Sequence, residues 1–135
     1  MGRADAIILE CPYDRLLTTV GHRFQSMHLP AFGLAHLLVF WGGMQNGYWG
    51  FSHNAIDYAV SVNCPALVIS GANDPWVRPD EAQDVLSRMC GSKRYVLMPG
   101  VGHEGACPKC RQQWRTTIRL FLEDLGSQPL PGIGR

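Results

Sequence analysis

Charged residues are scarce in this chain. Asp, Glu, Lys and Arg make up 17% of its 135 residues, whereas a typical soluble domain has about 25%. Two structures would explain so little charge: a parallel sheet that is buried on both faces, or a surface that another molecule or segment covers. The net charge is +1 and the Arg residues are scattered, so nothing in the composition indicates nucleic-acid binding.

Long hydrophobic runs are missing as well. The first five residues, Met1 to Asp5, hold no apolar segment of the kind that a secretory signal requires. The longest apolar stretch, residues 31–41, is interrupted by Gly33 and His36, and it is shorter than the roughly 18 residues that a membrane span needs. We therefore expect a cytoplasmic protein without a spanning helix.

The five cysteines do not suggest a disulfide framework, because the number is odd and the chain looks cytosolic. Cys107-Pro-Lys-Cys110 is a CxxC sequence, which can be a redox pair or half of a zinc site. A redox pair would be expected after the first strand of a thioredoxin-like unit, and a zinc site would need two more ligands, of which His103 is the only obvious one nearby. The simpler interpretation is a helix-opening turn with two incidental thiols. His103-Glu104 is not part of an H-E-x-x-H zinc motif, since no second His follows at helical spacing.

Three short apolar runs are present, at residues 6–9, 66–70 and 94–98, and each is typical of a buried strand. Residues 79–91 and 109–125 have apolar positions at helical spacing. The first of these helices begins with Pro79 and ends at Gly91, and the second ends at Gly126. This alternation predicts an α/β protein with a three-stranded parallel sheet and flanking helices.

A mixed segment, residues 15–63, separates the first two expected strands. Within it, residues 34–41 are spaced as a helix that Gly42-Gly43 would end, residues 45–54 look like an irregular segment or lid, and residues 54–62 could form a short helix. Its aromatic residues could line an apolar substrate pocket or form the core of the segment itself, and the second is the commoner arrangement; they are Phe40, Trp41, Tyr48, Trp49 and Phe51. The Pro/Gly-rich residues 126–135 are expected to be a disordered tail.

Asp74 and His103 are the most informative residues of the chain. Each follows a strand-like run and a glycine-containing turn, and the two lie 29 residues apart, which leaves room for one helix and one strand between them. Open α/β sheets hold their chemistry outside the carboxyl ends of their strands. An Asp that accepts a hydrogen bond from one imidazole nitrogen fixes the tautomer of the His and leaves the other nitrogen free to take a hydroxyl proton.

At these positions the chain resembles the C-terminal half of an α/β-hydrolase of the serine aminopeptidase-like group. The resemblance is carried by the segments IILECPYD (7–14), CPALVISGANDPWV (64–77) and PGVGHE (99–104), and by the order of the elements. It covers residues 6–125 and implies a partial α/β-hydrolase fold in which residues 15–63 are a cap-like insert. It also implies that Asp74 is the triad acid and His103 the triad base.

The nucleophile that such a triad requires is missing from the sequence. The family places a G-x-S-x-G elbow upstream of the acid, and the nearest approach here is Gly50-Phe-Ser52-His-Asn, which lacks the second glycine. The oxyanion-hole loop of the family is missing too. Asp14 and Glu10, after the first expected strand, are alternative acids, while His22, His28, His36 and His53 share no spacing and are expected to be solvated or at the edge of the core.

The resemblance implies serine-dependent hydrolysis of an ester, thioester or amide bond, with a small-molecule, peptide or acyl substrate and no cofactor or metal. Without a nucleophile, we expect this chain to be inactive by itself. The alternative is a non-enzymatic binding or assembly module, or a truncated product. An unpaired first strand would then bind a separate N-terminal half or a second copy of the chain.

Overall fold

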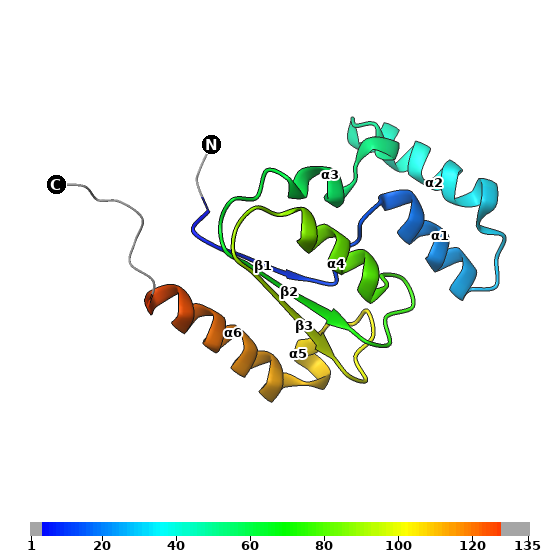
Figure 1. Cartoon of the computed structure of the whole chain (residues 1–135). Coiled ribbons are helices and arrows are strands. Elements are labelled where there is room, and N and C mark those ends of the chain that lie inside the picture. Colours follow the sequence, from blue (N-terminus) through cyan, green and yellow to red (C-terminus); the bar gives the residue numbers. More distant parts are fainter. Residues whose placement is uncertain (1–3, 128–135) are drawn as a thin grey trace.

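The computed structural model describes residues 4–127, with only the backbone at Cys107. Its centre is a three-stranded parallel sheet in the order β1 (Ile7–Glu10), β2 (Ala66–Gly71) and β3 (Lys93–Met98), as Figure 1 shows. Ile7 pairs with Ala66, and Ala66 pairs with Lys93. The three-stranded parallel sheet expected from the apolar runs is therefore confirmed.

Two helices cover opposite faces of the sheet, and β2 is buried along its whole length between them. Strand side chains alternate between the faces, so Ala66 and Val68 pack under α4 (Pro79–Arg88), whereas Leu67 and Ile69 pack under α6 (Arg111–Ser127). The α4 cluster also holds Ile56, Ala59, Ala82, Val85, Leu86 and Met89, and the α6 cluster holds Met98, Val101, Ala106 and Phe121.

Helix α4 begins at Pro79, as the sequence predicts. The carboxylate of Glu81 accepts a hydrogen bond from the backbone N–H of Arg78 (2.9 Å) and so satisfies one of the free donors at the helix start. Burial of Glu81 raises the pKa of its carboxyl group. The helix ends at Arg88 rather than at Gly91. Gly91 has a different role, because a Cβ there would lie 2.0 Å from the carbonyl oxygen of Cys64.

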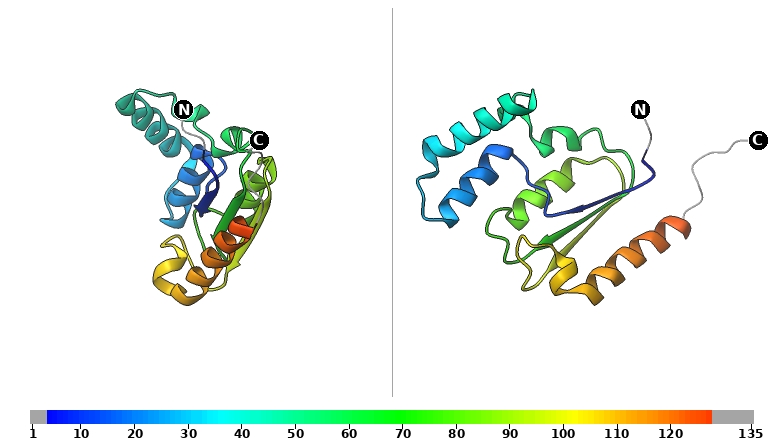
Figure 2. Two further views of the ribbon diagram at one scale, coloured as in Figure 1. Left: turned by 90° about the vertical axis from the view of Figure 1, so that its left-hand side faces the viewer. Right: turned by 180° about the vertical axis from the view of Figure 1, so that it is seen from behind.

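The segment between β1 and β2 is mostly helical. It contains α1 (Leu16–Ser26), α2 (Ala31–Asn46), the 3-10 turn η1 (Gly50–Ser52) and α3 (Ala55–Ala59). Helices α1 and α2 pack against each other and project from the sheet on the side away from α6 (Figures 1 and 2).

The expectation that Gly42-Gly43 ends a helix was wrong. Helix α2 continues through both glycines to Asn46, and Gly47 ends it with a left-handed φ of 74°. Gly43 is needed for packing instead, because a Cβ at this position would lie 2.6 Å from the carbonyl oxygen of Tyr48. The irregular segment expected at residues 45–54 is correspondingly shorter and contains η1.

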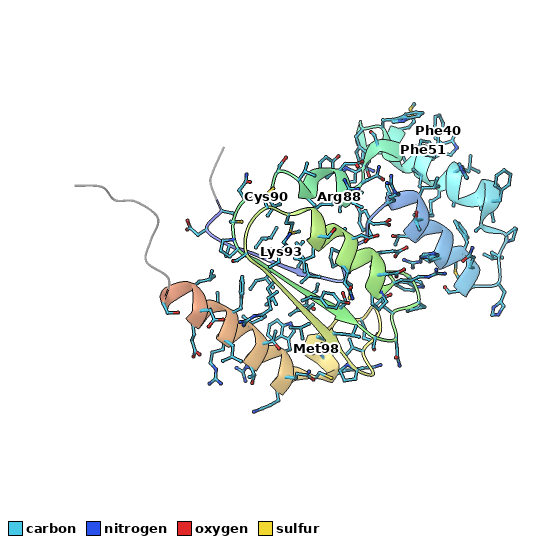
Figure 3. All side chains as sticks on the ribbon, in the orientation of Figure 1. Phe40, Phe51, Arg88, Cys90, Lys93 and Met98 are labelled. Atoms are coloured by element: carbon cyan, nitrogen blue, oxygen red, sulfur yellow. The ribbon has the colours of Figure 1, made fainter. Side chains whose placement is uncertain are left out.

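The aromatic group of this segment packs mainly on itself. Phe40 contacts Trp41 and Trp49, and Trp49 contacts Phe51, with ring centroids 5.1–6.4 Å apart. Figure 3 shows Phe40 and Phe51 at the end of the molecule far from α6. Trp41 and Trp49 remain more than half exposed in the described chain. Residues 24–56 also contain no Asp, Glu, Lys or Arg, so this is a weakly charged surface with exposed aromatic rings.

The last helix begins and ends later than the apolar spacing predicts. A short helix, α5 (Ala106–Lys109), precedes it, and α6 continues past Gly126 to Ser127. The Ser127 hydroxyl lies within hydrogen-bond distance of the carbonyl oxygens of Glu123 and Asp124 (3.1 and 2.9 Å), so its one proton is shared between two acceptors of the last turn. Residues 128–135, where a disordered tail was expected, lie outside the described residues.

The first strand is tied to the last helix through Glu10. Its carboxylate accepts hydrogen bonds from the indole N–H of Trp114 and from the backbone N–H of Ala106. This contact joins β1, α5 and α6 at one end of the sheet. Within residues 4–127, no helix has the length and apolar character that crossing a membrane requires.

Candidate active site

Three chemically active side chains follow the three strands of the sheet. Cys11 comes directly after β1, Asp74 follows β2 and His103 follows β3. Because the strands are parallel and adjacent, their carboxyl ends meet at the same edge. Each residue has one atom that could bind a metal ion, namely the sulfur of Cys11, a carboxylate oxygen of Asp74 and a ring nitrogen of His103, and these three atoms all lie within 4.8 Å of one another.

The loops after β2 and β3 are held together by backbone hydrogen bonds. Ala72 N–H donates to the Met98 carbonyl (3.0 Å), and Asn73 N–H donates to the Val101 carbonyl (2.9 Å). Gly71 makes this approach possible, because a Cβ there would lie 2.4 Å from the Val101 oxygen. The loop that carries Asp74 is therefore fixed against the loop that carries His103.

Asp74 is buried, and its carboxylate accepts hydrogen bonds from its own turn and from His103. Its Oδ1 accepts from the backbone N–H groups of Trp76 (2.9 Å) and Val77 (3.0 Å), and its Oδ2 faces His103 Nδ1 at 2.9 Å. Burial opposes ionisation of the carboxyl group. The three hydrogen bonds outweigh burial, so the pKa of Asp74 is lowered from its ordinary value.

His103 is oriented for proton transfer. A carboxylate only accepts hydrogen bonds, so Nδ1 carries a proton in the contact with Asp74, and in the neutral imidazole the lone pair is then on Nε2. The His103 side chain is 37% exposed, whereas that of Asp74 is fully buried. The imidazole thus has one fixed nitrogen and one that can accept a proton from an incoming group.

The alternative acids have other partners. The Asp14 carboxylate accepts from the backbone N–H of its neighbour Arg15, and Glu10 binds Trp114 and Ala106. The hydroxyl of Ser52 donates to the Trp49 carbonyl within η1 (3.1 Å). Of the carboxylates proposed from the sequence, it is Asp74 that bonds to His103.

Cys11 is a member of the site that the sequence analysis did not identify. It has a left-handed φ of 45° and lies beside Asp74. Burial and the neighbouring carboxylate raise the pKa of the Cys11 thiol to about 11, so the group is protonated at neutral pH. Cys11, Asp74 and His103 could together bind a divalent cation only if the thiol lost this proton and the Asp74–His103 hydrogen bond opened.

Trp76 also belongs to the site, and its indole ring lies against the His103 imidazole with ring centroids 4.7 Å apart. His22, one of the scattered histidines, contacts the backbone of Trp76, because its Nδ1 lies 3.0 Å from the Trp76 carbonyl oxygen. The rule that chemistry collects at strand ends could have identified Cys11. No sequence pattern indicated Trp76.

Cys110, the cysteine of the CxxC sequence whose side chain is described, does not belong to the cluster around Asp74 and His103, which we call the dyad. Cys110 is at the end of α5, and its sulfur is 4.0 Å from the Pro99 carbonyl oxygen. The side chain of Cys107 is outside the described residues.

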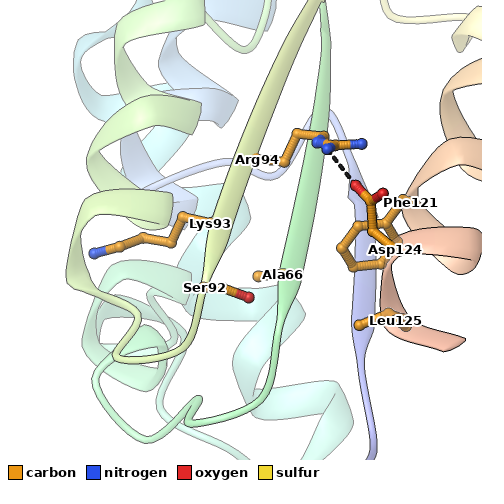
Figure 4. Close-up of a pocket in the computed structure, with 7 residues that line it drawn as sticks. All are labelled: Ala66, Ser92, Lys93, Arg94, Phe121, Asp124 and Leu125. Carbon is orange, nitrogen blue, oxygen red and sulfur yellow. Dashed lines mark hydrogen bonds and ion pairs between the residues drawn. The ribbon is translucent and has the colours of Figure 1, made fainter. Parts of the chain in front are cut away.

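Two hollows lie away from the dyad. A cavity of about 150 Å³ lies where β2 and β3 begin, next to the ion pair between Arg94 and Asp124 (Figure 4). An open groove of about 510 Å³ runs along α6 beside Trp114, Ile118 and Leu122. Neither hollow is lined by Asp74 or His103.

Comparison with curated proteins gives two related sequences. No family model matches the chain. Over 119 residues it is 31% identical to two uncharacterized proteins of Mycobacterium tuberculosis, MT2364 of strain CDC 1551 and Rv2307c of strain H37Rv. The match covers 88% of this chain and 37% of each relative, so the chain spans little more than a third of their length.

Solved structures identify the fold. The chain is similar to an esterase of Pyrococcus furiosus with a TM-score of 0.67 and 18% identity, over 89% of this chain and 45% of the esterase. It is similar to an esterase of Thermogutta terrifontis (TM-score 0.57, 16% identity, 90% and 56% covered). It also resembles MGS-M2, an α/β-hydrolase enzyme from a deep-sea metagenome library (TM-score 0.58, 14% identity, 96% and 59% covered). The chain therefore has a partial α/β-hydrolase fold.

Proposed function

We propose that this chain supplies the acid and the base of a serine-hydrolase site of the serine aminopeptidase-like group. The observation that carries the proposal is the 2.9 Å hydrogen bond between His103 Nδ1 and Asp74 Oδ2, which leaves Nε2 free. In such a site, Nε2 takes the proton of a serine hydroxyl as its oxygen attacks the carbonyl carbon of an ester, thioester or amide. Asp74 holds the imidazole and stabilises the imidazolium that forms.

The nucleophile and the oxyanion donors must come from residues outside this sequence. The 135 residues contain no G-x-S-x-G elbow, and the Cys11 thiol, with a pKa of about 11, is a poor nucleophile at neutral pH. Loss of the nucleophile and oxyanion donors removes most of the rate enhancement of such an enzyme. The chain alone is therefore inactive.

Hydrolysis of a p-nitrophenyl ester tests this proposal. We expect the purified chain to hydrolyse the ester no faster than its His103→Ala variant. Turnover by the chain that this substitution abolishes would contradict the claim of inactivity.

The positive half of the test uses the reading frame upstream of the chain. If that frame encodes a strand followed by G-x-S-x-G, the longer polypeptide should hydrolyse the ester, and Asp74→Asn should lower its kcat by about a thousandfold or more. A longer polypeptide whose activity is unaffected by Asp74→Asn would refute the role of the dyad.

We propose a second role, assembly through the free edge of β1. Among the described strands, β1 pairs with β2 on one side only, and its unpaired backbone groups can bind another strand. The binding partner would be a separate N-terminal half or a second copy of the chain. The oligomeric state of the purified chain tests the second of these partners.

A further inference from the structure

We infer that Trp76 is a positioning residue for His103 and that it connects the imidazole to helix α1. This inference rests on the proposed function, because it concerns the residue proposed as the base. Trp76 lies two residues after Asp74, and its backbone and side chain together contact both members of the dyad and three residues of α1.

The backbone of Trp76 links Asp74 to α1. Its N–H donates to Asp74 Oδ1 at 2.9 Å, and its carbonyl oxygen lies 3.0 Å from Nδ1 of His22 on α1. A carbonyl oxygen can only accept, so this nitrogen of His22 carries a proton. The turn that holds the Asp74 carboxylate is thereby attached to a helix of the segment between β1 and β2.

The indole of Trp76 makes a second connection to the same helix. Its Nε1–H donates to the Ser26 hydroxyl at 3.0 Å, and the guanidinium carbon of Arg23 lies 4.6 Å from the ring centroid. A cation at this distance from an indole is attracted to the ring. Two side chains of α1 therefore fix the plane of the ring that meets His103.

His103 needs such a support. Its side chain is partly exposed on a loop, and the hydrogen bond to Asp74 fixes one ring nitrogen but still permits the imidazole to rock about that contact. The indole lies at 4.7 Å with an interplanar angle of 56°, within the range of attractive ring pairs. Packing against Trp76 limits this motion and shields the Nδ1 proton from water.

The experiment measures the Nδ1 proton of His103 by NMR in the isolated chain. This signal is assigned by its absence from His103→Ala, and its exchange with water is compared among variants. Trp76→Leu keeps much of the volume but removes the aromatic ring, so exchange should become about two- to tenfold faster, the factor that an aromatic pair represents. Trp76→Phe restores a ring and should return the rate to within about twofold of the original.

Further variants separate the contributions. Arg23→Ala combined with Ser26→Ala leaves Trp76 in place but detaches it from α1, and should accelerate exchange to an intermediate degree. Trp41→Ala removes an exposed tryptophan of α2 and should change nothing. If Trp76→Leu does not give a folded circular dichroism spectrum, the double variant decides the test, and an unchanged rate there would refute the link to α1.

The outcomes distinguish this inference from the proposed function. Asp74→Asn should eliminate the protected Nδ1 signal whatever residue is at position 76. If Asp74→Asn eliminates the signal while Trp76→Leu leaves exchange unchanged, the dyad stands and the role of Trp76 is refuted. If Asp74→Asn leaves the signal intact, the dyad itself is refuted.

Discussion

Asp74 shows how one carboxyl group can be buried and still remain ionised. Its side chain is fully buried, which by itself favours the neutral form. Two backbone N–H groups and one imidazole N–H supply the hydrogen bonds that water would otherwise provide. The ionised form is therefore the one that the folded chain stabilises.

This balance predicts a specific pH dependence of stability. The pKa of Asp74 in the folded chain is below its ordinary value of 3.8, so its contribution is present above pH 3.8 and is lost as the pH falls through the folded value. Asp74→Asn should lower the free energy of unfolding at pH 7 by about 1–3 kcal/mol, the cost of losing charged hydrogen bonds. Below about pH 4 the variant should approach the original chain.

Urea unfolding at a series of pH values from 2 to 7 measures the difference in the free energy of unfolding between the two chains. The series extends below pH 3.8 because the pKa of Asp74 in the folded chain is lower than this value. Asp84→Asn is the matched control, because Asp84 is an exposed residue of α4, and its substitution should leave the curve within about 0.5 kcal/mol. Equal differences between Asp74→Asn and the original chain at pH 2 and pH 7 would show that ionisation of Asp74 does not stabilise the fold.

At the residue scale, the sequence predicts the contact between Asp74 and His103 because they follow two adjacent parallel strands, β2 and β3, that pair with each other. It does not predict Trp76. Contacts between Trp76 and residues 22–26 span about fifty positions, and they depend on how α1 docks, which no local spacing specifies.

At the scale of single elements, α6 owes its place to one face of side chains. Phe121 is 5% exposed and packs with Leu67 and Ile69 of β2. Its neighbour Leu122 points away from this cluster and is 52% exposed. Adjacent residues of the same helix therefore make very different contributions to stability.

Substitution of these two residues should reveal the difference. Phe121→Ala leaves a cavity under the helix and should lower the free energy of unfolding by about 3–5 kcal/mol. Leu122→Ala, the matched control, should lower it by less than about 1 kcal/mol. Urea unfolding curves of the two variants provide the measurement, and losses of similar size would contradict the packing of α6 described above.

The ends of the elements were harder to predict than their existence. Gly42-Gly43 and Gly126 look like helix stops in the sequence, yet α2 and α6 continue through them. A glycine ends a helix only where the chain turns away. At Gly43 the absence of a side chain serves a close approach of Tyr48 instead, which is a tertiary contact.

At the scale of the whole molecule, the free edge of β1 is the feature with the clearest test. The N–H of Ile7 donates to Pro65, the residue directly before β2, and the N–H of Cys11 donates to Ile69 of β2, so the N–H of Ile8 points away from β2. Ile8→Pro removes this outward donor without removing a bond to β2. If copies of the chain associate through β1, light scattering should show association of the original chain that increases with concentration, and Ile8→Pro should abolish it.

Leu97→Pro is the matched control at the other edge of the sheet. The Ser92 and Met98 carbonyls accept hydrogen bonds from Ala66 of β2 and from Ala72, the residue directly after β2, so the N–H of Leu97 points away from β2 in the same manner. This variant should associate like the original chain. A monodisperse monomer for the original chain at all concentrations would refute self-association, and equal effects of both prolines would show that β1 is not the specific edge.

The architecture as a whole could be predicted from the sequence because the parallel sheet has continuous apolar strands and each strand is followed by a distinct turn. Residues 15–63 could not be assigned in the same way. Helix α2 is apolar on nearly every side, so its sequence does not indicate which face packs on α1 and which remains exposed.

The hydrogen bond between Glu10 and Trp114 has a consequence for how the chain acquires its fold during synthesis. The two residues are 104 positions apart. Among the described strands, β1 pairs only with β2, which begins at Ala66. Contacts between such distant positions form slowly because a long loop must close first. On the ribosome, β1 is made before both β2 and Trp114, so it lacks these two partners until synthesis has reached them.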